Sequence, residues 1–421
     1  MKQLYALLLL LLAATAVFAQ DMLRVRQTID TLTSATMHGR GYIMEGDAKA
    51  ASYIQDKFKQ MGLQPFGKSY FQPFSFPVNT IAETPRLQVA GQVLKPGVDF
   101  VANAASASGQ GTADILKLDS TVIHAAAAQQ FFRQSFKGKA IVFRQQDQQQ
   151  INKLPPPYLQ KLQQAKVHII LQPRALLTSV APQQAPLPVL EVLEASWPKN
   201  ASSLTYDVKA QLKPRHEANN VIAYIKGSTQ PDSFLVFSAH YDHLGGQGKD
   251  VYFPGANDNA SGTAMLLELA EYYSQPQNRP AYSMAFIAFA AEEAGLLGSF
   301  YYTEHPLFPL RQIRFLLNLD LLGTGSEGIM VVNGKVHEQE FALLQQLNQH
   351  HQYLIQIRSR GKAANSDHYP FSEKGVPAFF FYTLGGTAAY HNTNDFAQQL
   401  PLTEFRDVFQ MIIDFAKELQ N

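Results

Sequence analysis

Residues that can bind divalent metal ions follow several apolar runs in the C-terminal half of this 421-residue chain. They are His240 and Asp242 after 234–239, Glu292 and Glu293 after 285–291, Asp320 after 315–319, Tyr390 and His391 after 379–384, and Asp258 in a turn between the first two runs. A single histidine or aspartate at such a place is usually a cap or a satisfied core group. Ligands of an open α/β sheet bind beyond the carboxyl ends of its strands, however, so five such positions on one predicted edge favour a functional site.

The residue types at these positions suit a centre with two divalent ions. Two imidazoles and three carboxylates are typical zinc ligands, with cobalt or manganese as substitutes. Two ions that lie close together need a bridging carboxylate, and Asp258 is the natural candidate. In the pair Glu292-Glu293, one carboxylate can bind metal while its neighbour takes a proton from water. The alternative is that Glu292 and Glu293 are surface acids that face bulk solvent. Their position directly after an apolar run argues against this alternative.

Strand-like and helix-like patterns alternate from Asn219 onward. This alternation predicts an α/β domain, whose elements would position the residues above. We expect strands at 221–225, 235–239, 284–290, 314–319, 329–332 and 378–382. We expect helices at about 260–273, 338–350 and 403–419. The sheet should be largely parallel.

The N-terminal half divides into two parts. Apolar spacing over residues 21–62 predicts two helices separated by a loop at 37–46. From about residue 82 to residue 213, short strand-like runs such as 139–143 and 167–171 alternate with glutamine-rich and proline-rich stretches. We therefore predict a smaller β-rich α/β domain inserted at 83–212, with 20–82 and 213–421 forming the main domain.

Composition limits the classes of function. With 46% hydrophobic and 16% charged residues the chain is globular rather than disordered. The 35 Lys and Arg against 34 Asp and Glu give no overall field that would attract nucleic acid. The absence of cysteine excludes disulfides, thiolate zinc sites and a cysteine nucleophile.

The first 19 residues have the pattern of a secretory signal peptide. Lys2 is followed by an apolar stretch with six consecutive leucines, Leu7 to Leu12, and by Val17-Phe18-Ala19 as a small-residue cleavage site. We expect a secreted or periplasmic protein without a stable membrane anchor after cleavage.

Five motifs together resemble the M28 zinc peptidases, a family of co-catalytic metallo-exopeptidases. They are Ala239-His-Tyr-Asp242, Gly255-Ala-Asn-Asp-Asn-Ala-Ser-Gly262, Ala291-Glu-Glu-Ala-Gly295, Asn318-Leu-Asp320 and Tyr390-His-Asn-Thr-Asn-Asp395, in family order. The resemblance implies a phosphorylase/hydrolase-like zinc exopeptidase fold, with a mixed, largely parallel central sheet flanked by helices.

The same resemblance assigns the ligands and the base. It implies that His240 and Asp320 hold one zinc ion, that Glu293 and His391 hold the other, and that Asp258 bridges the two. Glu292 would be the general base, and Asp242 would orient the imidazole of His240. It also implies a cis peptide at Asp258-Asn259.

Other residues near these motifs have two interpretations each. Tyr390 could donate to the oxyanion of the tetrahedral intermediate or serve only in packing. In Ser366-Asp367-His368 we expect a structural role, with Ser366 as helix N-cap. We expect His243 not to be a ligand, but either to support one or to be structural. We expect Arg40 to lie at the surface, with the cleft as the alternative.

The inserted segment resembles a protease-associated (PA) domain. The runs 136–143, 167–171 and 185–190 follow the order of that domain's central strands. Such a domain would act as a lid that restricts access to the cleft.

The main prediction is a two-zinc aminopeptidase that acts on peptides with a free N-terminus. One alternative is a single-zinc acyltransferase like glutaminyl cyclase, and another is a dipeptidase or carboxypeptidase of the same fold. A receptor-like relative without activity should lack ligands, and all five ligands and the base are present here.

Overall fold

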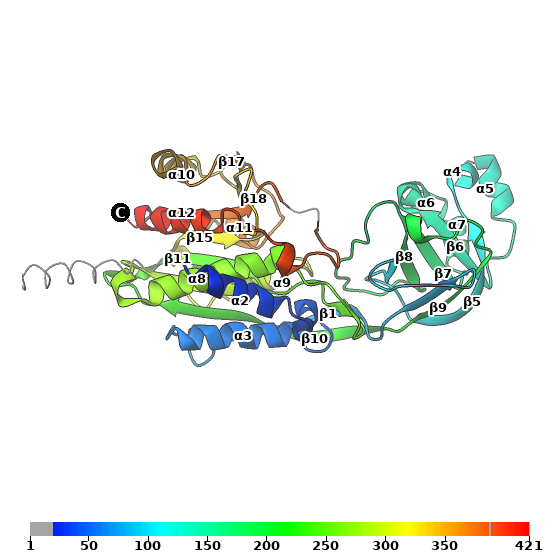
Figure 1. Ribbon diagram of the computed structural model, residues 1–421, viewed down its shortest axis with the longest axis horizontal. Helices are drawn as coiled ribbons and strands as arrows, with labels where there is room; N and C mark the ends of the chain where they lie inside the picture. Colours follow the sequence, from blue (N-terminus) through cyan, green and yellow to red (C-terminus); the bar gives the residue numbers. More distant parts are fainter. Residues whose placement is uncertain (1–19, 124, 387–388, 421) are drawn as a thin grey trace, which may run out of the picture.

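A computed structural model describes residues 20–123, 125–386 and 389–420, which form two lobes joined by two long strands (Figure 1). The main lobe contains both ends of the described chain. The second lobe, which we call the insert, is the segment 82–209 between strands β1 and β10. The predicted signal peptide, residues 1–19, lies outside the described residues.

The main lobe is built on a ten-stranded mixed sheet in the order β13-β12-β1-β10-β14-β11-β15-β18-β16-β17. Its strands are β1 (Phe71–Ile81), β10 (Ala210–Ile225), β11 (Gln230–His240), β12 (Gly246–Gln247), β13 (Val251–Tyr252), β14 (Tyr282–Phe289), β15 (Ile313–Leu319), β16 (Ile329–Val332), β17 (Ile357–Arg360) and β18 (Ala378–Thr383). The four central strands β14, β11, β15 and β18 run parallel to one another. This confirms the predicted fold class and brings the ends of these strands to one edge.

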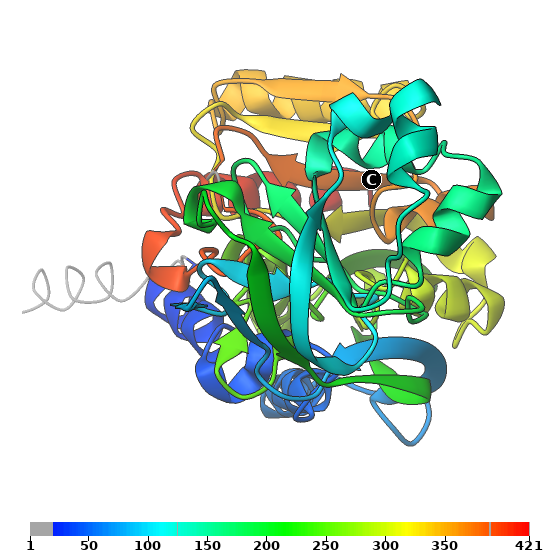
Figure 2. The same cartoon turned by 90° about the vertical axis from the view of Figure 1, so that its right-hand side faces the viewer.

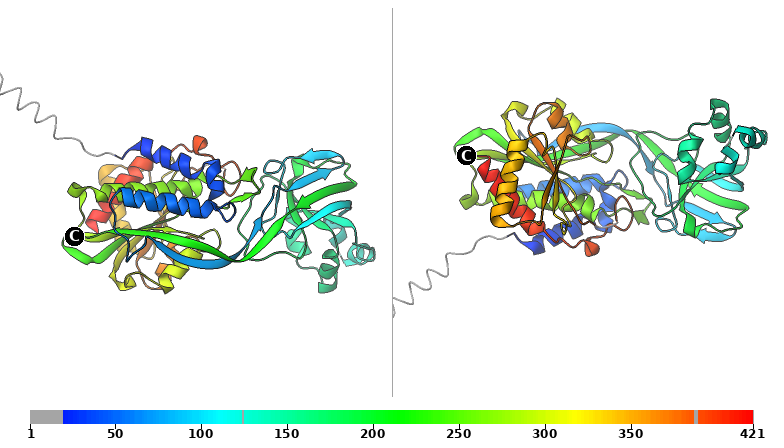
Figure 3. Two further views of the ribbon diagram at one scale, coloured as in Figure 1. Left: turned by 90° about the horizontal axis from the view of Figure 1, so that it is seen from below. Right: turned by 90° about the horizontal axis from the view of Figure 1, so that it is seen from above.

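Side chains alternate between two cores on the faces of the sheet. In β14, Phe286 and Ala288 face one core, whereas Ile287 and Phe289 face the other. The first core is covered by α2 (Met22–Leu32), α3 (Gly46–Gln60), α8 (Gly262–Ser274), α10 (Glu338–His351) and α12 (Phe405–Glu418). The second is covered by α9 (Leu297–Glu304) and α11 (His368–Glu373). Figure 3 shows α2, α3 and α8 side by side on one face.

All six predicted strands and all three predicted helices of the C-terminal half are present, and most bounds are shifted by a few residues. Strand β10 is the exception, because it begins at Ala210, eleven residues before the predicted start at Val221. Strand β1 was not predicted, because Pro73 and Pro77 interrupt its pattern. The structure accommodates Pro77 at a register shift between Phe76 and Val78, the kind of bulge where a strand tolerates proline.

The insert has its own eight-stranded sheet, in the order β3-β2-β9-β5-β6-β7-β8-β4 (Figure 2). Its strands are β2 (Arg86–Val89), β3 (Gln92–Leu94), β4 (Phe100–Ala102), β5 (Gly109–Lys117), β6 (Lys139–Arg144), β7 (Val167–Gln172), β8 (Val189–Leu193) and β9 (Ser203–Val208). Its helices are α4 (Ser120–Ile123), α5 (Ala125–Phe131), α6 (Gln148–Ile151) and α7 (Pro156–Leu162). Two apolar cores of its own make the insert a separate packing unit, with β8 beginning later than the predicted run 185–190.

The insert also packs on the main lobe beside the ends of the central strands. Val101 and Leu176 of the insert share a small apolar core with Leu244 and Phe253 of the main lobe. Within the described ranges, no helix combines the length and the apolar character needed to cross a membrane.

Candidate metal centre

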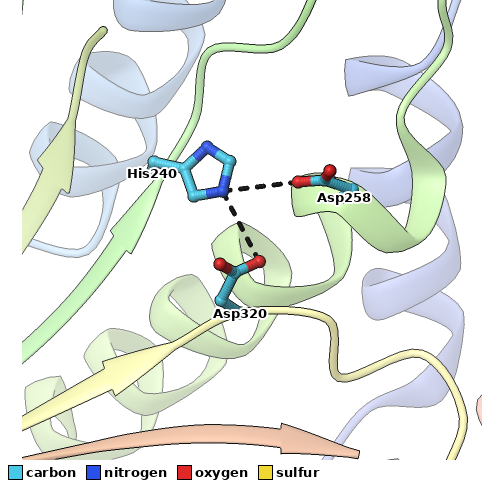
Figure 4. A group of neighbouring side chains, drawn as sticks. All are labelled: His240, Asp258 and Asp320. Carbon is cyan, nitrogen blue, oxygen red and sulfur yellow. Dashed lines mark ion pairs between the residues drawn. The ribbon is translucent and has the colours of Figure 1, made fainter. Parts of the chain in front are cut away.

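The first half of the site is a buried group of three residues (Figure 4). His240 is the last residue of β11, and Asp320 follows the last residue of β15. The Nε2 atom of His240 lies 3.4 Å from Oδ1 of Asp258 and 3.5 Å from Oδ1 of Asp320. Because β11 and β15 are adjacent and parallel, the sheet itself brings His240 and Asp320 together.

The second half of the site lies on the other side of Asp258. Nε2 of His391 is 3.0 Å from Oδ2 of Asp258 and 3.3 Å from Oε2 of Glu293. Glu293 belongs to the turn after β14, and His391 belongs to an irregular segment after β18. The five predicted metal ligands therefore lie together, around the shared carboxylate of Asp258.

Asp258 presents a different oxygen to each half. Its Oδ1 faces His240 and its Oδ2 faces His391, as expected for a carboxylate that bridges two ions. The peptide bond between Asp258 and Asn259 is cis, as predicted. Gly255 has φ +62°, and a Cβ atom there would come within 2.2 Å of the carbonyl oxygen of Asp258, so only glycine fits this turn.

The spacing and charge of these donors fit two zinc ions. Donors that share a tetrahedral zinc ion lie roughly 3.3–3.6 Å apart when each is about 2.0–2.2 Å from the ion. The distances of 3.4 and 3.5 Å in the first half and of 3.0 and 3.3 Å in the second half are close to this range. The carboxylates of Asp258, Asp320, Glu292 and Glu293 would carry four negative charges, which two divalent ions balance.

The same crowding shifts the pKa values of the metal-free site. Burial opposes a charge on His240, but Glu292 and Asp320 outweigh it and raise its pKa well above the usual value. Burial, together with neighbours that include Glu293, raises the pKa of Glu292 well above that of a free glutamate. Metal binding would displace the protons that these raised pKa values favour.

Asp242 holds the Glu292-Glu293 turn rather than the His240 ring. Its Oδ1 accepts the N–H of Glu292 at 3.1 Å, and its Oδ2 accepts the N–H of Glu293 at 3.3 Å. Nδ1 of His240 is 3.1 Å from the main-chain oxygen of Asp242 but 3.7 Å from its carboxylate. The predicted orientation of His240 thus comes mainly from the Asp242 carbonyl. Tyr42 holds the carboxylate in turn, through an O–H donated to Oδ2 at 2.8 Å.

Arg40 is fully buried, so the expected surface position is wrong. Its guanidinium donates to five main-chain carbonyl oxygens, those of Leu32, Tyr241, Pro254, Gly255 and Asp258, at 2.7–3.3 Å. Three of the five belong to the turn that carries the bridging carboxylate. The glycines beside Arg40 reflect the tight packing of its loop, because a Cβ atom on Gly39 would come within 2.2 Å of the Gly245 carbonyl oxygen. They do not indicate which groups the guanidinium binds.

Asp395 holds the same turn from the opposite side. Its carboxylate accepts the N–H groups of Asn257 at 3.0 Å and of Asp258 at 3.1 Å, and its main-chain oxygen accepts the N–H of Ala256. A buried cation thus binds the carbonyls of this turn while a buried anion binds its amides. Asp395 ends the last of the five family motifs, but the sequence did not predict this contact.

His243 contacts the predicted ligand Glu293, as one of its two interpretations implied, and it forms a candidate metal-binding group with Asp258 and Glu293. It is completely buried, and its Nδ1 is 2.7 Å from Oε1 of Glu293 and 4.0 Å from Oδ2 of Asp258. Burial, aided by the charge of Arg40, lowers its pKa to about 3 against the pull of Asp258, so the ring is neutral. A neutral imidazole that donates to Glu293 Oε1 leaves Oε2 free to face His391.

The remaining candidates, Tyr390, Ser366 and Asp367, lie next to predicted ligands. The ring of Tyr390 stacks on that of His391, with centroids 3.9 Å apart, and Tyr390 is 49% exposed. Ser366 is not the predicted N-cap, because its hydroxyl donates to Oδ2 of Asp320 at 3.1 Å and accepts from Asn318. Asp367 is buried next to it, and burial raises its pKa to about 7.

A comparison with known protein families finds that residues 220–416 match the sequence model described as Peptidase family M28. The chain is 31% identical to Aminopeptidase YwaD of Bacillus subtilis (strain 168) over 192 residues, which are 44% of this chain and 40% of that protein. The chain thus aligns with less than half the length of this relative.

Solved structures share the fold over nearly the whole chain. BSAP, a zinc aminopeptidase from Bacillus subtilis, superposes with a TM-score of 0.68 at 21% identity, covering 95% of both chains. A peptidase M28 precursor from Shewanella amazonensis SB2B superposes with a TM-score of 0.69 at 17% identity, covering 94% of this chain and 95% of that one.

Proposed function

Because the chain belongs to peptidase family M28, we propose that it is a two-zinc aminopeptidase that removes N-terminal residues from peptides. The observation that carries the proposal is the carboxylate of Asp258, whose two oxygens face two separate groups of ligands. The choice of the N-terminal end rests on the names of two relatives, Aminopeptidase YwaD and the zinc aminopeptidase BSAP. Other relatives are named as glutamate carboxypeptidase homologs, so the carboxypeptidase alternative stays open.

The ligand sets divide the work of holding the metal. His240 and Asp320 would hold one zinc ion, Glu293 and His391 the other, and Asp258 both. Cobalt or manganese would be substitutes. When bound at such a site, zinc supplies a Lewis acid that polarises the scissile carbonyl and lowers the pKa of water.

Glu292 would move the proton of the reaction. With zinc bound, Glu292 would be ionised, and its carboxylate would accept a proton from the attacking water. As the bond between the carbonyl carbon and the amide nitrogen breaks, Glu292 would return this proton to the leaving amine. Asp242 would keep Glu292 in place through its main-chain N–H.

Two further roles belong to this proposal. Tyr390, which is half exposed beside His391, would donate its O–H to the developing oxyanion. The insert, predicted at 83–212, would be a PA-like domain that limits access to the cleft. Its contacts beside the ends of the central strands support this.

The signal-peptide pattern at residues 1–19 supports secretion or export to the periplasm. Expression of the full chain followed by N-terminal sequencing of the exported protein tests this. A mature protein that begins at Gln20 is the expected result.

The experiment that tests the activity is hydrolysis of matched short peptides with free and with acetylated N-termini, by zinc-loaded protein and after chelation. Cleavage of the free peptides alone, abolished by chelation, is the expected result. Equal cleavage of both sets from the C-terminus would indicate a carboxypeptidase. Loss of ammonia from peptides with N-terminal glutamine, without hydrolysis, would indicate a glutaminyl cyclase.

A further inference from the structure

The segment that carries His391 is attached to the insert at two points. The N–H of Thr178, in the loop between β7 and β8, donates to the main-chain oxygen of His391 at 3.0 Å. The hydroxyl of Thr393 donates to the main-chain oxygen of Gly97, in the loop between β3 and β4, at 2.8 Å. Two different loops of the insert therefore bind the chain at or within two residues of a predicted metal ligand.

His391 depends on such attachments more than the other histidine ligand does. His240 ends a central strand and its side chain is 1% exposed, whereas His391 lies outside any helix or strand, is 20% exposed and has φ +52°. On the side of the main lobe, this segment is fixed through Leu384, whose N–H donates to Gly328, and through Asp395, four residues after His391. The two bonds to the insert lie between these points and hold the chain close to His391.

The two insert loops are themselves held on the main lobe at sites away from His391. Leu176 packs with Val101 against Leu244 and Phe253. The side-chain amide of Gln247 both accepts from the N–H of Ala102 at 2.9 Å and donates to its carbonyl at 2.6 Å. The anchors are therefore fixed independently of the segment, so the segment takes its position from them.

We propose that the insert positions His391 for the second ion, so that ion affinity in this half of the site depends on contacts made by another domain. Thr178, Gly97 and Thr393 act as positioning residues, because they restrain the main chain and not the imidazole. A restrained segment loses less conformational freedom when the ion binds, and this raises affinity. This inference rests on the proposed two-zinc site.

Two matched pairs of variants test the proposal. Thr393→Val removes the hydroxyl that donates to Gly97 at nearly constant volume, whereas Thr393→Ser keeps it. Thr178→Pro removes the donated N–H, whereas Thr178→Ala keeps it. We measure binding of zinc to the chelated full chain by calorimetric titration and competition with a chromophoric chelator, and follow the filling of each half by cobalt absorption.

For the ion of the second half we expect an affinity loss of about three- to tenfold in Thr393→Val, typical of one hydrogen bond, and a comparable loss in Thr178→Pro. The affinity for the ion of the first half and the melting temperature of the metal-free protein should stay unchanged, as should both affinities in Thr393→Ser and Thr178→Ala. Equal losses for both ions, or wild-type affinities in Thr393→Val and Thr178→Pro, overturn the proposal while leaving the proposed function intact. A wild-type protein that binds fewer than two zinc ions overturns the proposed function and this inference together.

Discussion

The two halves of the metal centre are built in different ways. In the first half, His240 and Asp320 stand at the ends of adjacent parallel strands, and their positions follow from the hydrogen bonds of the sheet. In the second half, Glu293 lies in a turn and His391 in an irregular segment, and each needs contacts from elsewhere in the chain. Asp258 belongs to both halves, and its turn is held by charged side chains rather than by a strand.

The difference shows how a sheet can support a site that is wider than its strands. A strand end is rigid without further support, because its neighbours fix its direction and register. A ligand on a loop reaches the same rigidity only when its main chain is bound, here by Asp242 for Glu293, by Asp395 and Arg40 for Asp258, and by Thr178 for His391. Apart from the shared Asp258 turn, the first half should therefore be insensitive to changes outside the sheet, and the second half should be sensitive to them.

The largest expected effect comes from Glu292→Gln, which removes the proton acceptor and leaves every ligand in place. We expect kcat to fall by at least about 10²–10⁴-fold, the usual contribution of general base catalysis. Zinc content should remain at two ions per chain, measured by elemental analysis of the purified variant. Retained turnover would reject Glu292 as the base. Loss of one ion would show that Glu292 helps to bind metal.

Replacing Arg40 tests whether the shared Asp258 turn needs its buried charge. Arg40→Met removes the donor of five main-chain carbonyls and leaves them buried. We expect the free energy of unfolding, measured by urea denaturation without metal, to fall by about 3–5 kcal/mol, as when one member of a buried charged network is removed. Both halves should lose zinc affinity, because Asp258 serves both.

The control is Arg215→Met, at an arginine whose side chain is 75% exposed and pairs with Glu217. It should change stability by less than about 1 kcal/mol. Loss of affinity in one half alone after Arg40→Met would contradict the view that the two halves share one clamped turn.

How far the sequence predicts the site follows the same division. The strands that lead to His240, Glu292 and Asp320 were predictable, because apolar runs of this length determine their own structure and bring the residues after them to one edge of the sheet. The pairing of ligands came from the resemblance, and it stays a prediction; the structure brings the five residues together around Asp258.

The supporting residues could not be predicted, because their contacts join positions far apart in the chain. Arg40 bonds to carbonyls near residues 241 and 255, and a carbonyl leaves no mark in the sequence. For His243 a supporting role was one of two interpretations, but nothing in the sequence identified Glu293 as its partner. Thr178 acts through its N–H, which nearly every residue type has, so no sequence pattern points to it.

Replacing His243 should affect only the second half. His243→Ala removes the donor that holds Oε1 of Glu293 and frees this carboxylate to turn. Loss of a partner that orients a ligand typically costs about 10–100-fold in metal affinity. We expect this loss for the ion of the second half, measured by chelator competition. His243→Gln, which keeps an N–H donor, should recover part of the loss. His216→Ala removes a similar imidazole–carboxylate contact, of 2.6 Å to Asp47, and should leave both affinities unchanged. A loss of affinity for the ion of the first half would show that the contact between His243 and Glu293 affects both halves.

A last effect, on stability rather than on metal affinity, concerns Asp367, a buried carboxylate beside the first half. Its pKa rises to about 7 through burial, with further contributions from Asp242 and Asp320 and opposition from His240. A carboxyl with a folded pKa above its unfolded value of about 4 holds a proton in the folded state only, so metal-free stability falls as the pH rises from about 4 to 7, by up to about 1.4 kcal/mol per pH unit. Asp367→Asn cannot ionise and should remove this contribution, so the variant gains stability over the wild type across this range and the gain levels off above about pH 7. Urea denaturation of both proteins at pH 5, 6, 7 and 8 measures the difference. Two bound zinc ions would favour the ionised carboxylate and should shrink it. A constant difference at every pH would mean that Asp367 is already charged in the folded protein and that the first half is less crowded with buried carboxylates than the structure indicates.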